Sequence, residues 1–173
     1  MSEDQKNPVR LAEHFAASQK FAELFSGGMD LVEETASFLD GEGRAAAKGL
    51  SPAAAGLYGA ESMRLTTRLM QLASWLLLQR AVGEGEMSVE QVIDEKKNVR
   101  LDQLPSRRLG SGWDELPSQF ISLIDRSIAL QKRVRTLDDE IYRRGTDEAE
   151  QADNPVASQH ALLETAFDLR FRG

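Results

Sequence analysis

The sequence predicts an all-α protein, namely an antiparallel three-helix bundle with a short extra helix and a flexible C-terminal tail. Three long segments repeat apolar residues at the three- and four-residue spacing of a helix face, and long runs of β-branched residues are absent. Capping residues, prolines and glycines separate these segments, as expected where helices begin and end. A chain of 173 residues is long enough for one domain with a real core and extensions.

The N-terminal residues are more polar than the segments that follow. Residues 1–16 open on the polar string MSEDQKNPVR, which lacks the apolar stretch of a secretory signal, so we expect a flexible N-terminus and a cytoplasmic protein.

Residues 17–145 are expected to form the bundle. Its first helix should begin after Ser18, a suitable N-cap, and end near Leu39, where Gly41 suits the left-handed position after a helix. Apolar residues recur every seven positions along it, at Leu24, Leu31 and Phe38 and at Phe25, Val32 and Leu39.

The second helix is the most informative segment. After a connector over residues 41–50, Ser51 supplies an N-cap and Pro52 a first-turn proline. The helix should reach about Val82 and stop at Gly83 and Gly85. Some 30 residues at 1.5 Å each give a length of roughly 45 Å.

The apolar residues of this helix exceed what a single face can hold. Leu65, Leu69, Leu72 and Leu76 form one stripe, and Met63, Met70, Leu77 and Ala81 form a second stripe about 150° away. A helix that is apolar nearly all round must be covered nearly all round, by the core and by another copy or partner. A membrane is excluded, because the uncharged run between Arg68 and Arg80 has about 11 residues and a span needs about 20. We expect the dimer or partner face to comprise Met63, Met70, Trp75, Leu77 and Leu78.

Two further helices are predicted before the tail. Ser88 and Gln91 have the spacing of a capping box, which indicates a short helix from Val89 to about Lys97. Residues 99–113 contain one proline and two glycines and are expected to form a long loop. The third long helix should start between Asp114 and Pro117 and end at Arg144. Its apolar stripe is Leu123, Leu130, Val134, Leu137 and Ile141.

The composition changes after Gly145. Residues 146–157, TDEAEQADNPVA, are polar and acidic, so residues 146–173 are expected to be a disordered acidic tail. The tail carries a short apolar segment, which either docks on a partner groove or folds back on the bundle. The residues expected to dock are Leu162, Leu163, Phe167 and Phe171.

The residue types that usually carry catalysis or metal binding are either missing or far apart in the sequence. Cysteine is absent, and the two histidines, His14 and His160, lie at opposite ends of the chain. No Glu-x-x-His pair of a di-metal bundle occurs in the three helices. The net charge of −7 argues against nucleic-acid binding. We therefore predict no catalytic, cofactor-binding or metal-binding residues and a protein that is not an enzyme.

Two strings carry a family resemblance. LVEETASFLDGEGR over Leu31–Arg44 and ESMRLTTRLMQLASWLLLQRAVGEGEMS over Glu61–Ser88 resemble the alphaproteobacterial family of the regulator of CtrA degradation, also known as a domain of unknown function. The resemblance covers about residues 18–142. It implies a homodimeric three-helix bundle that joins the ClpXP protease, together with a response-regulator adaptor and a cyclic-di-GMP-binding adaptor. The founding member of the family is associated with the cell pole.

Two functions remain open at this stage. The first is a non-enzymatic adaptor that helps deliver protein substrates, such as cell-cycle transcription regulators, to the ClpXP protease. The alternative is a small-molecule or nucleotide-sensing helical regulator with a pocket between helices. The polar residues of such a pocket would be Arg64, Arg68 and Arg80.

Overall fold

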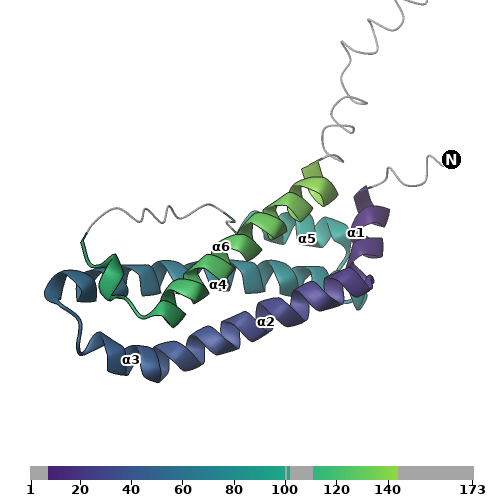
Figure 1. The fold of residues 1–173 in the computed structure, drawn as a ribbon. Helices are drawn as coiled ribbons and strands as arrows, with labels where there is room; N and C mark the ends of the chain where they lie inside the picture. Colours follow the sequence, from purple (N-terminus) through teal and green to yellow (C-terminus); the bar gives the residue numbers. More distant parts are fainter. Residues whose placement is uncertain (1–7, 100, 102–110, 144–173) are drawn as a thin grey trace, which may run out of the picture.

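The computed structural model describes residues 8–99, 101 and 111–143. Over these residues the protein is an all-α helical bundle, which confirms the predicted fold class (Figure 1). No helix in these ranges is long and apolar enough to cross a membrane. The elements are α1 (Pro8–Ala16), α2 (Gln19–Asp40), α3 (Glu42–Ala47), α4 (Pro52–Gly83), α5 (Val89–Lys96), the 3₁₀ turn η2 (Trp113–Glu115), α6 (Ser118–Asp138) and the π-helical turn η3 (Asp139–Arg143).

Helix α2 runs antiparallel to α4 and α6, whereas α4 and α6 run in the same direction (Figure 1). At the beginning of α4 the backbone N–H of Ser51 donates to Glu115, just before α6. Near the end of α4, Gln79 accepts a hydrogen bond from Tyr142, just after α6. Residues 84–117 separate α4 from α6 along the chain, a connection long enough to allow the parallel arrangement.

The predicted helix starts are confirmed by their caps. The hydroxyl of Ser18 accepts a hydrogen bond from the backbone N–H of Phe21 at 3.2 Å, and that of Ser51 accepts from Ala54 at 3.3 Å. Ser88 and Gln91 form both bonds of the capping box. Each cap satisfies a backbone donor that the first helical turn leaves free and stabilises its helix by about 1 kcal/mol.

Two segments that we expected to be irregular are helical. The predicted flexible N-terminus over residues 1–16 is wrong for residues 8–16, because α1 buries Ala12 completely in a second cluster with Val82, Val89 and Val92. The predicted connector over residues 41–50 contains α3. Gly41 has φ −106° rather than the left-handed conformation, because the chain passes directly from α2 into α3.

The core lies among α2, α4 and α6. The first stripe of α4 is buried as predicted, with exposed fractions of 0 to 4% for Leu65, Leu69, Leu72 and Leu76. Gly28 of α2 permits close packing there, since a Cβ at this position would lie 2.5 Å from Leu76 Cδ1. Helix α6 ends at Asp138 and continues as the π turn, so the predicted single α-helix to Arg144 is wrong in its last turn.

Candidate functional site

Helix α4 presents large apolar side chains to solvent. Met63, Met70 and Leu77 are 74%, 67% and 50% exposed. They are seven residues apart, so they lie in one row along the helix. Exposed side chains of this size in a continuous row are typical of a protein-binding surface.

This row is half of a longer pattern, which we call the outer seam. Its positions alternate between three- and four-residue steps, as in a coiled coil, and all of them are exposed and uncharged. The N-terminal positions are small, and at Gly56 an added Cβ would meet nothing within 4 Å. No contact inside the described chain explains glycine there, although glycine costs a helix about 1 kcal/mol relative to alanine. The outer seam comprises Ala53, Gly56, Ala60, Met63, Thr67, Met70, Ser74 and Leu77.

A second seam faces the opposite way on the same helix. It has the same spacing, and every position in it is buried. Two seams back to back explain why α4 carries more apolar surface than one face can hold. The inner seam comprises Glu61, Leu65, Arg68, Leu72, Trp75, Gln79 and Val82.

Trp75 does not belong to the partner face, and its assignment there is wrong. The side chain is fully buried in the inner seam, where its indole Nε1–H donates to Asp138 Oδ1 at 2.7 Å. Leu78 is half-buried and packs against the second cluster, which includes Val82 and Val89. The predicted face therefore reduces to its three exposed members, Met63, Met70 and Leu77.

Polar contacts in the inner seam fix how α4 and α6 align. Arg68 Nη1 donates to Ser127 Oγ at 2.8 Å, and the Tyr142 hydroxyl donates to Gln79 Oε1 at 2.8 Å. With the bond from Trp75 to Asp138, these contacts occur at three levels along the two helices. Buried polar pairs specify the register of paired helices because any slip leaves them without partners.

The three arginines of the alternative hypothesis do not converge on a pocket. Arg68 is fully buried in the inner seam, where burial lowers its pKa and nearby Glu61 opposes that shift. Arg64 pairs with the buried carboxylate of Glu61. Arg80 pairs with Glu84 at 2.7 Å and lies over the Phe25 ring. Each guanidinium is thus engaged within the bundle rather than directed at a common ligand.

A polar cluster closes the end of the bundle where α4 and α6 finish. Lys96 of α5 forms an ion pair with Asp138 at 2.5 Å and lies 3.5 Å from the centre of the Tyr142 ring. Burial lowers the pKa of Lys96, while Asp138 opposes the shift. Burial raises the pKa of Tyr142 to about 12. No pattern of the sequence pointed to this cluster, because its members come from three separate elements.

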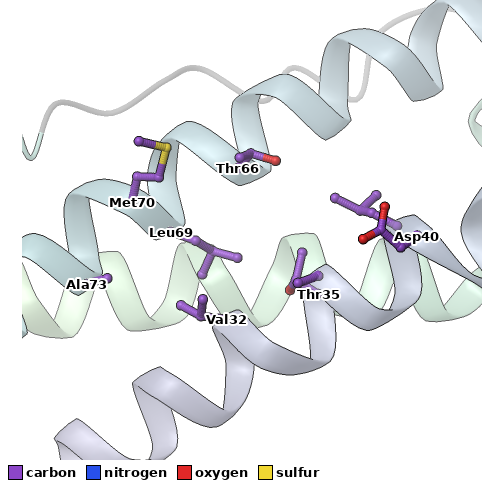
Figure 2. A pocket seen from close by; sticks show the side chains of 9 residues that line it. Val32, Thr35, Asp40, Thr66, Leu69, Met70 and Ala73 are labelled. Carbon is purple, nitrogen blue, oxygen red and sulfur yellow. The ribbon is translucent and has the colours of Figure 1, made fainter.

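A groove lies between α2 and α4 beside the outer seam. Its volume is about 290 Å³, at the lower end of the range for small-ligand sites. Side chains of both helices face each other across it, and Met70 belongs both to the groove and to the outer seam (Figure 2). The lining residues are Val32, Thr35, Ala36, Leu39, Asp40, Thr66, Leu69, Met70 and Ala73.

Two further kinds of site concern a metal ion and the C-terminal tail. Within residues 8–99, 101 and 111–143, no group of three or more acidic or histidine side chains could hold a metal ion. The predicted tail-docking residues, Leu162, Leu163, Phe167 and Phe171, lie outside the described residues.

Comparisons with known proteins extend these observations. The family model described as "Protein of unknown function (DUF1465)" matches residues 12–167. The chain is 48% identical to RcdA from Caulobacter crescentus CB15 in its crystal structure, with a TM-score of 0.62. That match covers 75% of this chain and 97% of the other. Comparison with curated proteins gave no match.

Proposed function

Because the chain belongs to the DUF1465 family, which the match to RcdA connects with the regulators of CtrA degradation, we propose that it is a non-enzymatic adaptor. It helps deliver protein substrates, such as cell-cycle transcription regulators, to the ClpXP protease. Its partners are the protease complex, with a response-regulator adaptor and a cyclic-di-GMP-binding adaptor, and a second copy of this chain. An adaptor of this kind acts at the cell pole by raising the effective concentration of substrate near the protease.

The outer seam of α4 is the observation that carries the proposal. Its exposed positions run without a charge from Ala53 to Leu77. A charge-free exposed row of this length serves binding rather than solubility, because surfaces without a partner favour mixed charges.

Reconstituted proteolysis tests the proposal. The rate at which purified ClpXP and its partner adaptors degrade a substrate is measured with and without this chain. The chain should raise the rate, and Met70→Glu should abolish the increase by placing a charge in the outer seam. Ser122→Glu, an exposed position of α6, is the matched control and should retain full activity. Equal activity of the two variants, both folded by circular dichroism, would contradict the role of the seam.

A second copy is the partner that the outer seam fits by shape. In an antiparallel pair, the small residues around Gly56 of one copy would face the large residues around Met70 of the other. Each methionine or leucine that becomes buried contributes about 1.5 to 3 kcal/mol before the cost of association. Light scattering at micromolar concentration should give a dimer. Serine at Met63, Met70 and Leu77 together should give a folded monomer, whereas a monomeric unchanged chain would exclude the pairing.

The tail is proposed to make a second contact in delivery. A chain that ends at Gly145 should keep the bundle and lose delivery of those substrates that need the tail. The control is the melting temperature, which should not change. Undiminished delivery of every substrate tested would remove the tail from the mechanism.

A further inference from the structure

The groove between α2 and α4 has an apolar floor. Val32 of α2 faces Leu69 and Ala73 of α4 across it (Figure 2). Ala36 and Leu39 of α2 also line the groove. Its volume of about 290 Å³ suits a few side chains inserted from a neighbouring surface. A helix laid along such a groove inserts residues spaced by three, four and seven positions.

The two rims of the groove differ in charge. Asp40 lines the groove on the α2 side, and Glu33, seven residues earlier, lies in the same row. Both carboxylates are exposed, and neither forms an ion pair with any residue in the described ranges. On the α4 side the exposed large side chain at the rim is Met70, which is uncharged. The groove is thus apolar at its base, acidic along one rim and apolar along the other.

We infer that this groove binds an amphipathic helix of a partner protein whose basic residues lie along one side only. Its apolar residues would enter the floor, and its lysines or arginines would lie over α2 beside Glu33 and Asp40. This inference rests on the proposed adaptor function and specifies the chemistry of one docking partner. Opposite charges across a rim fix the orientation of a bound helix and speed its association.

Charge also disfavours the two occupants that the chain itself could supply. The apolar part of the tail, residues 158–172, has no net positive charge, because Glu164 and Asp168 offset Arg170 and Arg172, and residues 146–157, which lead into it, are acidic and contain no lysine or arginine. They would place like charges beside Glu33 and Asp40. The outer seam of a second copy contains no basic residue and could not neutralise the charge of this rim.

Fluorescence anisotropy with three labelled peptides tests the inference. The first is a designed amphipathic helix with leucines on one face and lysines along one flank. The second has the same sequence with glutamates in place of the lysines, and the third is residues 158–172 of this chain. The first peptide should bind at least tenfold more tightly than the other two, and its affinity should fall as salt is raised.

Two double variants of equal charge change supply the matched comparison. Glu33→Lys with Asp40→Lys should reverse the preference, so that the glutamate peptide binds more tightly than the lysine peptide. Glu23→Lys with Asp30→Lys changes the same helix at the same seven-residue spacing, away from the groove, and should keep the original preference. Equal effects of both double variants, or no preference among the peptides, would overturn the inference.

Two other results would also overturn the inference. One is tighter binding of residues 158–172 than of the lysine peptide. The other is a dimer that buries the groove, so that no peptide binds. Delivery by ClpXP is measured separately. Stimulated proteolysis without peptide preference would defeat this inference alone, and peptide preference without stimulated proteolysis would defeat only the proposed function.

Discussion

Tyr142 makes the stability of the bundle depend on pH in the alkaline range. Its buried hydroxyl donates to Gln79, and burial raises its pKa from 10.0 to about 12. The unfolded chain releases this proton near pH 10, whereas the folded chain retains it. The stabilisation is therefore complete below pH 10 and is lost as the pH rises through 12. At about 1.4 kcal/mol for each pKa unit, the loss by pH 12 is about 2 to 3 kcal/mol.

The substitution Tyr142→Phe isolates this contribution. It removes the titrating hydroxyl and keeps the ring that Lys96 contacts. Below pH 10 the variant should be less stable by about 1 kcal/mol, because Gln79 Oε1 loses its donor. Between pH 10 and 12 its free energy of unfolding should fall by about 2 to 3 kcal/mol less than that of the unchanged chain. Urea unfolding followed by circular dichroism from pH 8 to 12 measures both curves. Parallel curves would refute the argument, since Lys96, Asp138 and Asp139 are common to both chains.

Four further predictions concern helix packing, a buried charge and a cap, each measured by urea unfolding at neutral pH. Gly27→Ala should gain up to about 1 kcal/mol of helix propensity, because its Cβ would meet nothing within 4 Å. Gly28→Ala should be less stable than Gly27→Ala by about 1 to 3 kcal/mol, because the Leu76 side chain would have to move. Equal free energies of unfolding for the two variants would contradict the close packing at Gly28. Arg68→Met should leave the free energy of unfolding unchanged or raise it by up to about 4 kcal/mol. The reason is that Nε and Nη2 of Arg68 find no hydrogen-bond partner in the described part of the chain. A loss of stability above about 3 kcal/mol would contradict this reasoning. Ser88→Ala should cost about 1 kcal/mol, and no change would mean that the capping box is dispensable.

The features that could be predicted from the sequence are local ones. Ser18, Ser51 and Ser88 cap helices because a serine hydroxyl reaches a backbone donor three residues on, whatever the rest of the fold does. The stripe containing Leu65 and Leu72 was also predictable, since only a helix places such residues on one face.

The features that could not be predicted depend on distant partners. Glu61 and Arg68 are charged, so periodicity alone could not show that their row is buried, and Trp75 in the same row was placed on the surface. The signal that could have found this row is its seven-residue repeat, from Glu61 through Arg68 and Trp75 to Val82. Helix α1 was missed because it has only nine residues, so its apolar repeat of Val9, Ala12 and Phe15 is short. The common direction of α4 and α6 is a property of the tertiary arrangement, which no local pattern of the sequence specifies.

The two seams of α4 separate what a substitution does to folding from what it does to recognition. A change at Leu72 or Trp75 alters the stability of every copy, because these side chains are fully enclosed. A change at Met63 or Met70 alters side chains that are mostly exposed in the free chain. Substitutions along the outer seam can therefore change which partner binds, while the inner seam on the other side of the same helix keeps the bundle folded.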